Sequence, residues 1–334
     1  MGYRGNGAGG ADRRINLGKG YGQRLGGGAV VGLLSFNAWV TSNNPQIIKK
    51  LASLYSGATV PIPQPMPDSF VPFRVMEQHS NGNSAVYRLS ERHHEIAVLD
   101  SLNDAVAHLE YRINAAAVVS LGQHLLIHAG VVASDGGGIL LPGASGAGKS
   151  TLVASLSLSG FTYLSDEVAV LDRHSLAALP FQKSICLKEG GWQALTTAFD
   201  PPPSTLDARR GDGELVRYLA ALRPHPAEER LQIRHILLPD YRQGSRVGLT
   251  SISRATALAE LARHSLNLAR HGWSGVDALV GLVEGAACYR FTYCNLREAV
   301  ATISTLVGRG PETLSTTATA LGGSIEAGTR CGVS

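Results

Sequence analysis

The chain has 334 residues, which is too long for one small hydrophobic core and predicts two domains. Apolar residues make up 44% of the chain and charged residues 17%, as in a globular protein. The net charge of +4 and the aromatic content of 6% argue against a nucleic-acid partner, because such proteins carry concentrated basic patches or stacking aromatics.

Composition divides the chain into four parts. We expect a Gly-rich basic tail over residues 1–28, an α+β accessory domain over 29–120, an α/β catalytic domain over 121–310 and a low-complexity tail over 311–334. The apolar run at 29–40 is about half the length needed to span a bilayer, so we interpret it as a packed segment and expect no membrane partner.

The accessory domain shows mostly strand signals. A proline-rich stretch at 61–73 is followed by strand-like runs at 70–78, 85–90 and 94–100, which predict a small antiparallel sheet. His93 and His94 lie between the last two runs and are interpreted as a surface turn. A helix is predicted over 101–123, where Ser101 and Asp104 resemble a capping box.

The catalytic domain begins with alternating strands and a helix. We predict strands at 124–134 and 139–142 around a DGGG turn, a helix over 151–160 that ends at Gly160, and strands at 161–165 and 167–172. Residues 201–230 predict a loop with a short helix, 235–242 and 288–294 predict strands, and 256–268 and 296–307 predict helices. This order is typical of an α/β domain.

The stretch LLPGASGAGKST, residues 140–151, carries the clearest functional signal. Gly143, Gly148, Lys149 and Ser150 match the P-loop pattern G-x-x-x-x-G-K-[ST], between a predicted strand and a predicted helix. In such a loop the backbone N–H groups surround phosphates, the lysine contacts the β- and γ-phosphates, and the serine hydroxyl binds Mg²⁺. The predicted nucleotide-binding residues are Gly143, Ala144, Ser145, Gly146, Ala147, Gly148, Lys149, Ser150 and Thr151.

Two further features accompany the loop. Asp166 and Glu167 follow a strand in YLSDEVAV, and a phosphotransferase needs one carboxylate near Mg²⁺ and one base for the acceptor proton. His128 lies in LLIHAG, where a lone histidine on an apolar strand is more often a core residue than a functional one.

Together these motifs resemble the HPr kinase/phosphorylase family. The matching pieces are His128-Ala129-Gly130, GASGAGKS and Ser165-Asp166-Glu167, within residues 124–172. A looser likeness reaches residue 308 and is similar to divergent HPr-kinase-like proteins found beside bacterial peptide natural-product genes, including lasso-peptide kinases. The resemblance implies an HPr-kinase-like nucleotide core, of the type shared with phosphoenolpyruvate carboxykinase.

The resemblance also implies roles for individual residues. Asp166 would be the catalytic base, Glu167 and Ser150 would lie on the Mg²⁺ side, Lys149 would hold the phosphates, and His128 would orient or tune Asp166. The family's second signature, an acidic-Ile-Arg-Gly-type stretch, is absent, so the resemblance does not extend to HPr as the substrate or to phosphorylase activity.

Other residues are weaker candidates. Lys183 and Lys188 could reach a phosphate or a substrate carboxylate, or could lie on a solvated strand edge. Arg234 and His235 could line the cleft, and residues 209–213 could close over substrate. The four cysteines form no CxxC pair and have no metal spacing, which favours free thiols in the cytoplasm; they are Cys186, Cys288, Cys294 and Cys331.

The motifs predict a cytoplasmic kinase that uses ATP and Mg²⁺. The resemblance implies that it phosphorylates a serine hydroxyl of a peptide or protein, in peptide natural-product biosynthesis for example. Two alternatives stay open. One is a small-molecule kinase acting on serine or a sugar, and the other is a nucleotide-gated scaffold that transfers nothing. Homo-oligomerisation is also open, because classical family members are oligomeric.

Overall fold

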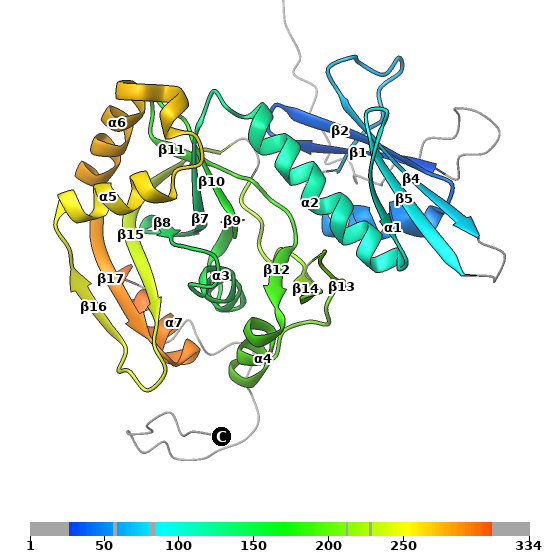
Figure 1. The fold of residues 1–334 in the computed structure, drawn as a ribbon. Helices are drawn as coiled ribbons and strands as arrows, with labels where there is room; N and C mark the ends of the chain where they lie inside the picture. The colour runs from blue at the N-terminus through cyan, green and yellow to red at the C-terminus, as the bar shows by residue number, and fades with distance from the viewer. Residues whose placement is uncertain (1–26, 56–58, 80–83, 212, 227–228, 309–334) are drawn as a thin grey trace, which may run out of the picture.

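The computed structural model describes residues 27–55, 59–79, 84–211, 213–226 and 229–308. The two predicted tails lie almost entirely outside these residues, as does Cys331. In the described residues, the fold is mixed α/β with three sheets and seven helices (Figure 1). None of the helices within those ranges is long and apolar enough to cross a bilayer.

The first sheet contains the three strand-like runs of the accessory region. Its order is β3-β1-β2-β4-β5-β6, formed by β1 (Gly27–Leu33), β2 (Phe36–Ser42), β3 (Thr59–Val60), β4 (Val71–His79), β5 (Ala85–Glu91) and β6 (His94–Leu99). Strands β4, β5 and β6 pair antiparallel as predicted. Strands β2 and β4 pair parallel, and the crossover that this requires carries helix α1 (Pro45–Leu54). The apolar run at 29–40 forms the buried β1–β2 hairpin.

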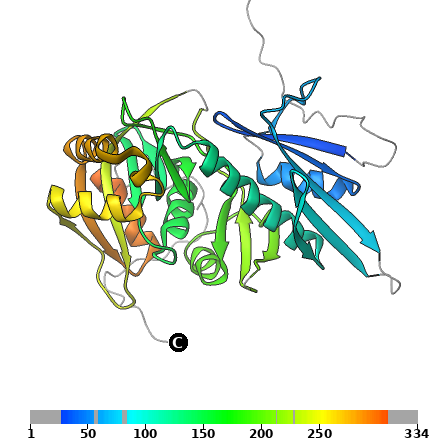
Figure 2. The same ribbon diagram turned by 45° about the horizontal axis from the view of Figure 1, so that its top comes forward.

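Helix α2 (Leu102–Ser120) lies between this sheet and the rest of the molecule (Figures 1 and 2). Its predicted start is confirmed, because the Ser101 hydroxyl accepts a hydrogen bond from the Asp104 N–H at 3.4 Å. Ala105, Leu109 and Ile113 recur at helical spacing and are fully buried. One apolar cluster joins α2 and the first sheet to residues beyond position 120, including Phe181.

The second sheet contains the P-loop strand. Its order is β11-β10-β7-β8-β15-β17-β16, with β9 paired to β7. The strands are β7 (Leu125–Ser134), β8 (Gly137–Pro142), β9 (Thr162–Ser165), β10 (Val168–Leu171), β11 (Ala177–Leu179), β15 (Leu231–Tyr241), β16 (Gly248–Ser251) and β17 (Ala287–Tyr293). Strands β8, β15 and β17 are parallel neighbours.

Helices cover both faces of this sheet. Helices α5 (Arg254–His264) and α6 (Leu268–Glu284) pack on one face, and α3 (Lys149–Leu158) and α7 (Leu296–Leu306) pack on the other. The side chains of β8 alternate between these layers, since Leu140 joins the first core and Ile139 and Leu141 join the second. Gly130 allows α3 to approach β7, because a Cβ there would lie 2.5 Å from Val153 Cγ2.

A third, small sheet lies beside the P-loop helix. It has the order β12-β14-β13, with β12 (Ile185–Lys188), β13 (Leu206–Arg209) and β14 (Leu215–Leu219), and β12 leads into helix α4 (Glu189–Ala198). The prediction of a loop with a short helix over 201–230 is therefore wrong. The four-residue strand β13 buries only Leu206 and Ala208, so its apolar alternation is too short to stand out among prolines and charges.

Candidate functional site

The P-loop joins β8 to α3 as predicted. Gly146 and Gly148 have φ values of 85° and 84°, a left-handed conformation that residues with a Cβ adopt only under strain. Leu152 N–H donates to Gly148 O at 2.9 Å, so the helix begins directly after the last glycine. The loop therefore presents the positive end of α3 at its mouth, which is a favourable place for a phosphate.

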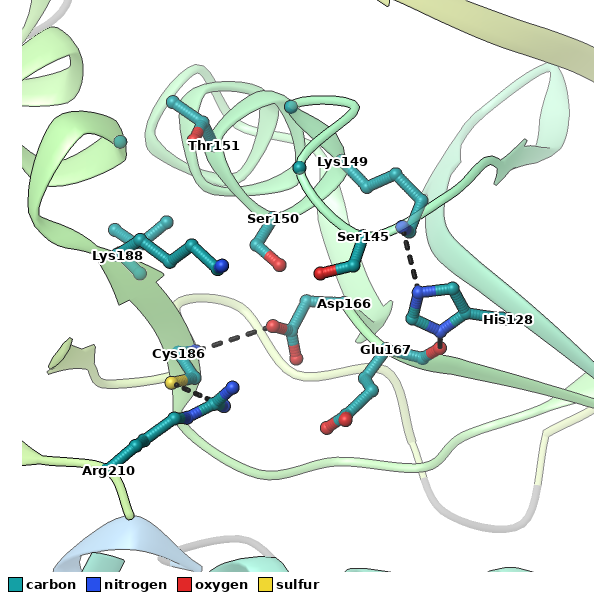
Figure 3. A pocket seen from close by; sticks show the side chains of 14 residues that line it. His128, Ser145, Lys149, Ser150, Thr151, Asp166, Glu167, Cys186, Lys188 and Arg210 are labelled. Carbon is teal, nitrogen blue, oxygen red and sulfur yellow. Dashed lines mark hydrogen bonds between the residues drawn. The ribbon is translucent and has the colours of Figure 1, made fainter. Parts of the chain in front are cut away.

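A pocket of about 190 Å³ opens at this loop (Figure 3). Loop and α3 residues form one side, acidic residues and His128 form the base, and β12, α4 and a turn form the far side; the lining residues are His128, Ser145, Gly146, Gly148, Lys149, Ser150, Thr151, Asp166, Glu167, Cys186, Leu187, Lys188, Gly191 and Arg210. Most of the predicted site residues are thus brought together in one place. The hydroxyls of Ser145 and Ser150 point into the pocket in Figure 3.

Lys149 is buried, with 5% of its surface exposed. Its Nζ donates to the carbonyl oxygens of Gly143 and Ala144, both at 2.8 Å, and lies 3.0 Å from His128 Nε2. None of these three partners is a carboxylate. Burial lowers the pKa of Lys149 to about 8, although the more distant charges of Asp166 and Glu167 oppose this shift.

The hydrogen bonds of His128 indicate one tautomer. Its Nδ1 lies 3.0 Å from the backbone oxygen of Glu167, which can only accept, so Nδ1 carries the proton and Nε2 accepts from Lys149. Burial, and then the Lys149 ammonium, lower the pKa of His128, which keeps the ring neutral. The expectation that His128 orients the Asp166 carboxylate is therefore wrong: both ring nitrogens are occupied by Lys149 and the Glu167 backbone.

The sequence did not predict the role of Lys183. This side chain is buried, and its Nζ lies 3.3 Å from Asp166 Oδ1, 3.4 Å from Glu167 Oε2 and 3.4 Å from Glu110 Oε1. We call these four residues the Lys183 cluster. Burial alone would lower the pKa of Lys183, but the three carboxylates outweigh it and hold the pKa well above its usual value. Both predictions for Lys183, a substrate contact and a solvated strand edge, are wrong.

Glu110 brings helix α2 into this cluster. It accepts hydrogen bonds from Asn114 and, at 3.2 Å, from the Tyr218 hydroxyl. Burial raises the pKa of Glu110, and the Lys183 ammonium opposes that shift. No sequence motif marks Glu110, because a single acidic residue in a helix is ordinarily solvent-exposed.

The two acidic residues of the pocket have different surroundings. Asp166 is 2% exposed, and its carboxylate accepts from the Tyr163 hydroxyl at 3.0 Å and the Cys186 N–H at 3.3 Å. The Glu167 side chain is 38% exposed. Burial would raise the pKa of Glu167, but Lys183 and then Arg210 outweigh that effect and lower it, so the carboxylate is ionised at neutral pH.

The far side of the pocket supplies further positive charge. Arg210, in the turn after β13, donates to Cys186 Sγ at 3.2 Å and lies across the pocket from Lys149 (Figure 3). Burial raises the pKa of Cys186 to about 11, so this thiol is neutral and leaves the guanidinium charge uncompensated at that contact. Lys188 also lines the pocket and pairs with Glu214 at 2.9 Å.

The residues present fit Mg²⁺ bound together with a polyphosphate. Among the described residues, no group of three His, Cys, Asp or Glu side chains could hold a metal ion alone. Mg²⁺ in nucleotide sites needs only one or two carboxylates, with the remaining ligands from phosphates and water. Ser150 and Glu167 supply a hydroxyl and a partly exposed carboxylate in the same pocket.

Several weaker candidates lie elsewhere. Arg234 and His235 do not line the pocket, because they lie in the first half of β15, beside the beginning of β8, whereas the P-loop follows the end of β8. His93 and His94 are exposed at the β5–β6 hairpin, as predicted. Among the described residues, Cys186, Cys288 and Cys294 form no disulfide bond.

Comparisons with known proteins add no name to this site. No model of a known protein family matches the chain, and no curated protein matches it.

Proposed function

We propose that the protein is an ATP-dependent kinase that transfers the γ-phosphoryl group to a serine hydroxyl of a peptide or protein. The observation that carries this proposal is the grouping of a P-loop, a lysine without a carboxylate partner and two carboxylates around one pocket of about 190 Å³. A nucleotide-binding loop alone would support simple binding. The acidic pair beside it adds the groups that phosphoryl transfer to a hydroxyl requires.

Each of these pocket residues has its own role in the proposed phosphoryl transfer. The loop N–H groups and Lys149 would bind the β- and γ-phosphates, and Ser150 and Glu167 would hold Mg²⁺. The acceptor oxygen forms a bond to the γ-phosphorus, the bond from that phosphorus to the β–γ bridging oxygen breaks, and ADP leaves. Asp166 takes the hydroxyl proton. Mg²⁺ held by these residues would supply neutralisation of the phosphate charge.

Arg210, on the far side of the pocket, also contributes to the proposed phosphoryl transfer. Charge spreads over the equatorial oxygens of the transferred phosphoryl group in the transition state. A guanidinium across the pocket from Lys149 stabilises that charge from the acceptor side. Catalysis then consists mainly of positioning and charge neutralisation by groups already in place.

The test is intact-mass spectrometry of a reaction with ATP, Mg²⁺ and serine-bearing peptides encoded by neighbouring genes, with free serine and sugars as further acceptors. Wild type is compared with Asp166→Asn and with Asp135→Asn, which changes an exposed turn residue away from the pocket. We expect one phosphate on one peptide, retained in Asp135→Asn and reduced at least about 100-fold in Asp166→Asn.

Other outcomes would select the alternatives. Phosphate on free serine or a sugar, with no peptide modified, would favour the small-molecule kinase. ATP binding without transfer to any acceptor, unaffected by Asp166→Asn, would contradict the kinase proposal and favour a nucleotide-gated scaffold.

A further inference from the structure

Tyr241 is an exposed aromatic residue beside the P-loop. It is the last residue of β15 and 54% of its surface is exposed. Its Cβ lies 3.9 Å from the position that a Cβ on Gly148 would occupy, and Gly148 itself lines the pocket. The exposed ring of Tyr241 therefore lies next to Gly148 of the P-loop.

The Tyr241 ring packs against a buried ring, which in turn stacks on a second buried ring. It packs edge-on against Tyr293, with ring centroids 5.8 Å apart, and Tyr293 stacks on Phe291 at 5.2 Å. The Tyr293 hydroxyl donates to Gly148 O at 3.5 Å, which ties this column of rings to the first turn of α3. The column thus fixes an exposed ring at a defined position relative to the loop.

The strand order of the sheet relates the position of Tyr241 to that of the acidic pair. Strands β8, β15 and β17 are parallel, and ligands of open α/β sheets bind outside the carboxyl ends of such strands. Asp166 and Glu167 follow β9, which pairs with β7 on one side of β8. Tyr241 ends β15 on the opposite side of β8. A phosphate chain that points its reacting end at the acidic pair would direct its other end toward Tyr241.

The pocket volume agrees with a ligand whose phosphates lie in the pocket and whose other end lies toward Tyr241. Sites that enclose a whole small-molecule ligand have volumes of about 300–1,000 Å³, whereas this pocket has about 190 Å³. A pocket of this volume favours a placement with the phosphates inside it and the nucleoside on the adjoining surface.

We propose that Tyr241 is the platform on which the base of the phosphoryl donor stacks, so that the donor is a nucleoside triphosphate rather than a plain polyphosphate. This inference rests on the proposed binding of a nucleotide at the P-loop. The rival ring is Trp192, which follows the pocket residue Gly191. Its face is covered by the Arg217 guanidinium at 5.7 Å, and the ring packs against the apolar core.

The test compares a ligand that has a base with one that lacks it. Calorimetric titrations with Mg²⁺ and either β,γ-methylene ATP or inorganic tripolyphosphate are made on wild type, Tyr241→Ala, Tyr241→Phe and Trp192→Ala. Tyr111→Ala is the matched control, because this tyrosine is 55% exposed on α2. Stacking of a base on an aromatic ring contributes enough for Tyr241→Ala to weaken the ATP analogue about tenfold or more.

The expected pattern is selective. Tyr241→Ala weakens the ATP analogue and leaves tripolyphosphate unchanged, while Tyr241→Phe and Tyr111→Ala bind both ligands as wild type does. Equal loss of both ligands in Tyr241→Ala, no loss at all, or a selective loss in Trp192→Ala instead, would each overturn the inference while leaving the proposed function standing. If wild type bound neither ligand, the proposed function would fail and this inference with it.

Discussion

Two buried lysines near the acidic pair have opposite electrostatic surroundings. Lys149 donates to two backbone carbonyls and a neutral histidine, and burial lowers its pKa to about 8. Lys183 is surrounded by three carboxylates, which overcome burial and raise its pKa. The same type of side chain therefore has no carboxylate partner in one position and three carboxylate partners in the other.

The difference indicates what each lysine does. A buried cation without a carboxylate partner is energetically costly, and an incoming anion relieves that cost. A buried cation with three carboxylates stabilises the arrangement of those carboxylates and has no charge to offer a ligand. Lys149 is thus suited to bind phosphate, and Lys183 is suited to hold Asp166 and Glu167 in place.

The largest expected effect comes from removing Lys183. Lys183→Met leaves three carboxylates close together without their cation, and we expect the free energy of unfolding to fall by about 3–5 kcal/mol. Chemical denaturation at pH 7 measures it. Lys188→Met is the control, because Lys188 pairs with Glu214 at the surface, and its effect should stay within about 0.5 kcal/mol. Equal effects in the two variants would refute the distinction.

Removing Lys149 should affect transfer rather than folding. Lys149→Met removes a cation from the phosphate site, and we expect the rate of phosphoryl transfer to fall about 10²–10³-fold. The free energy of unfolding should fall far less than in Lys183→Met, because a buried charge without a carboxylate partner is removed. Transfer assays and denaturation of the same preparation measure both quantities. A loss of stability as large as that of Lys183→Met would contradict the comparison.

Removing one carboxylate partner of Lys183 should have an intermediate effect. Glu110→Gln leaves Lys183 with Asp166 and Glu167, so we expect the free energy of unfolding to fall by about 1.5–3 kcal/mol, the size of one hydrogen bond to a charged group. Chemical denaturation of Glu110→Gln, Lys183→Met and the double variant measures the interaction energy between Glu110 and Lys183. Additive effects of the two substitutions would show that Glu110 and Lys183 are not coupled.

The smallest effect is a pH dependence of polyphosphate affinity. The pKa of Lys149 in the free protein is about 8, and a bound polyphosphate raises it. The bound protein therefore holds more protons than the free protein above pH 8, and affinity should fall as pH rises, by up to about tenfold per unit. Tripolyphosphate titrations between pH 7 and 9.5 measure this. A flat profile in wild type, or the same slope in Lys149→Arg, whose charge does not titrate, would count against it.

The sequence predicted the elements whose pattern is local. The P-loop has a fixed spacing of glycine, lysine and serine, and β7, β8 and α3 show continuous apolar runs with clear turn residues. Helix α2 was found from its cap at Ser101 and its apolar spacing. Helix α6 (Leu268–Glu284) was missed, because the predicted helix at 256–268 runs from α5 into its first residue and Gly272 interrupts the pattern with a φ of 55°.

The parts of the site that were not predicted depend on contacts between distant segments. Glu110 and Lys183 are 73 positions apart and meet only because α2 packs beside the P-loop domain. Nothing in the local sequence of either residue shows that it is buried or paired. His128 was found, but its partners were not, since the orientation of its ring is set by the Glu167 backbone.

The most direct test of the central claim is a calorimetric titration of wild type and Lys149→Met with Mg²⁺ and β,γ-methylene ATP at pH 7. We expect saturable binding at one site per chain in wild type and a loss of about 10²-fold or more in the variant. Lys188→Met, whose side chain also lines the pocket but is already paired, should bind nearly as well as wild type. Equal binding by wild type and Lys149→Met, or no binding by wild type, would contradict the claim that the P-loop pocket is a polyphosphate site.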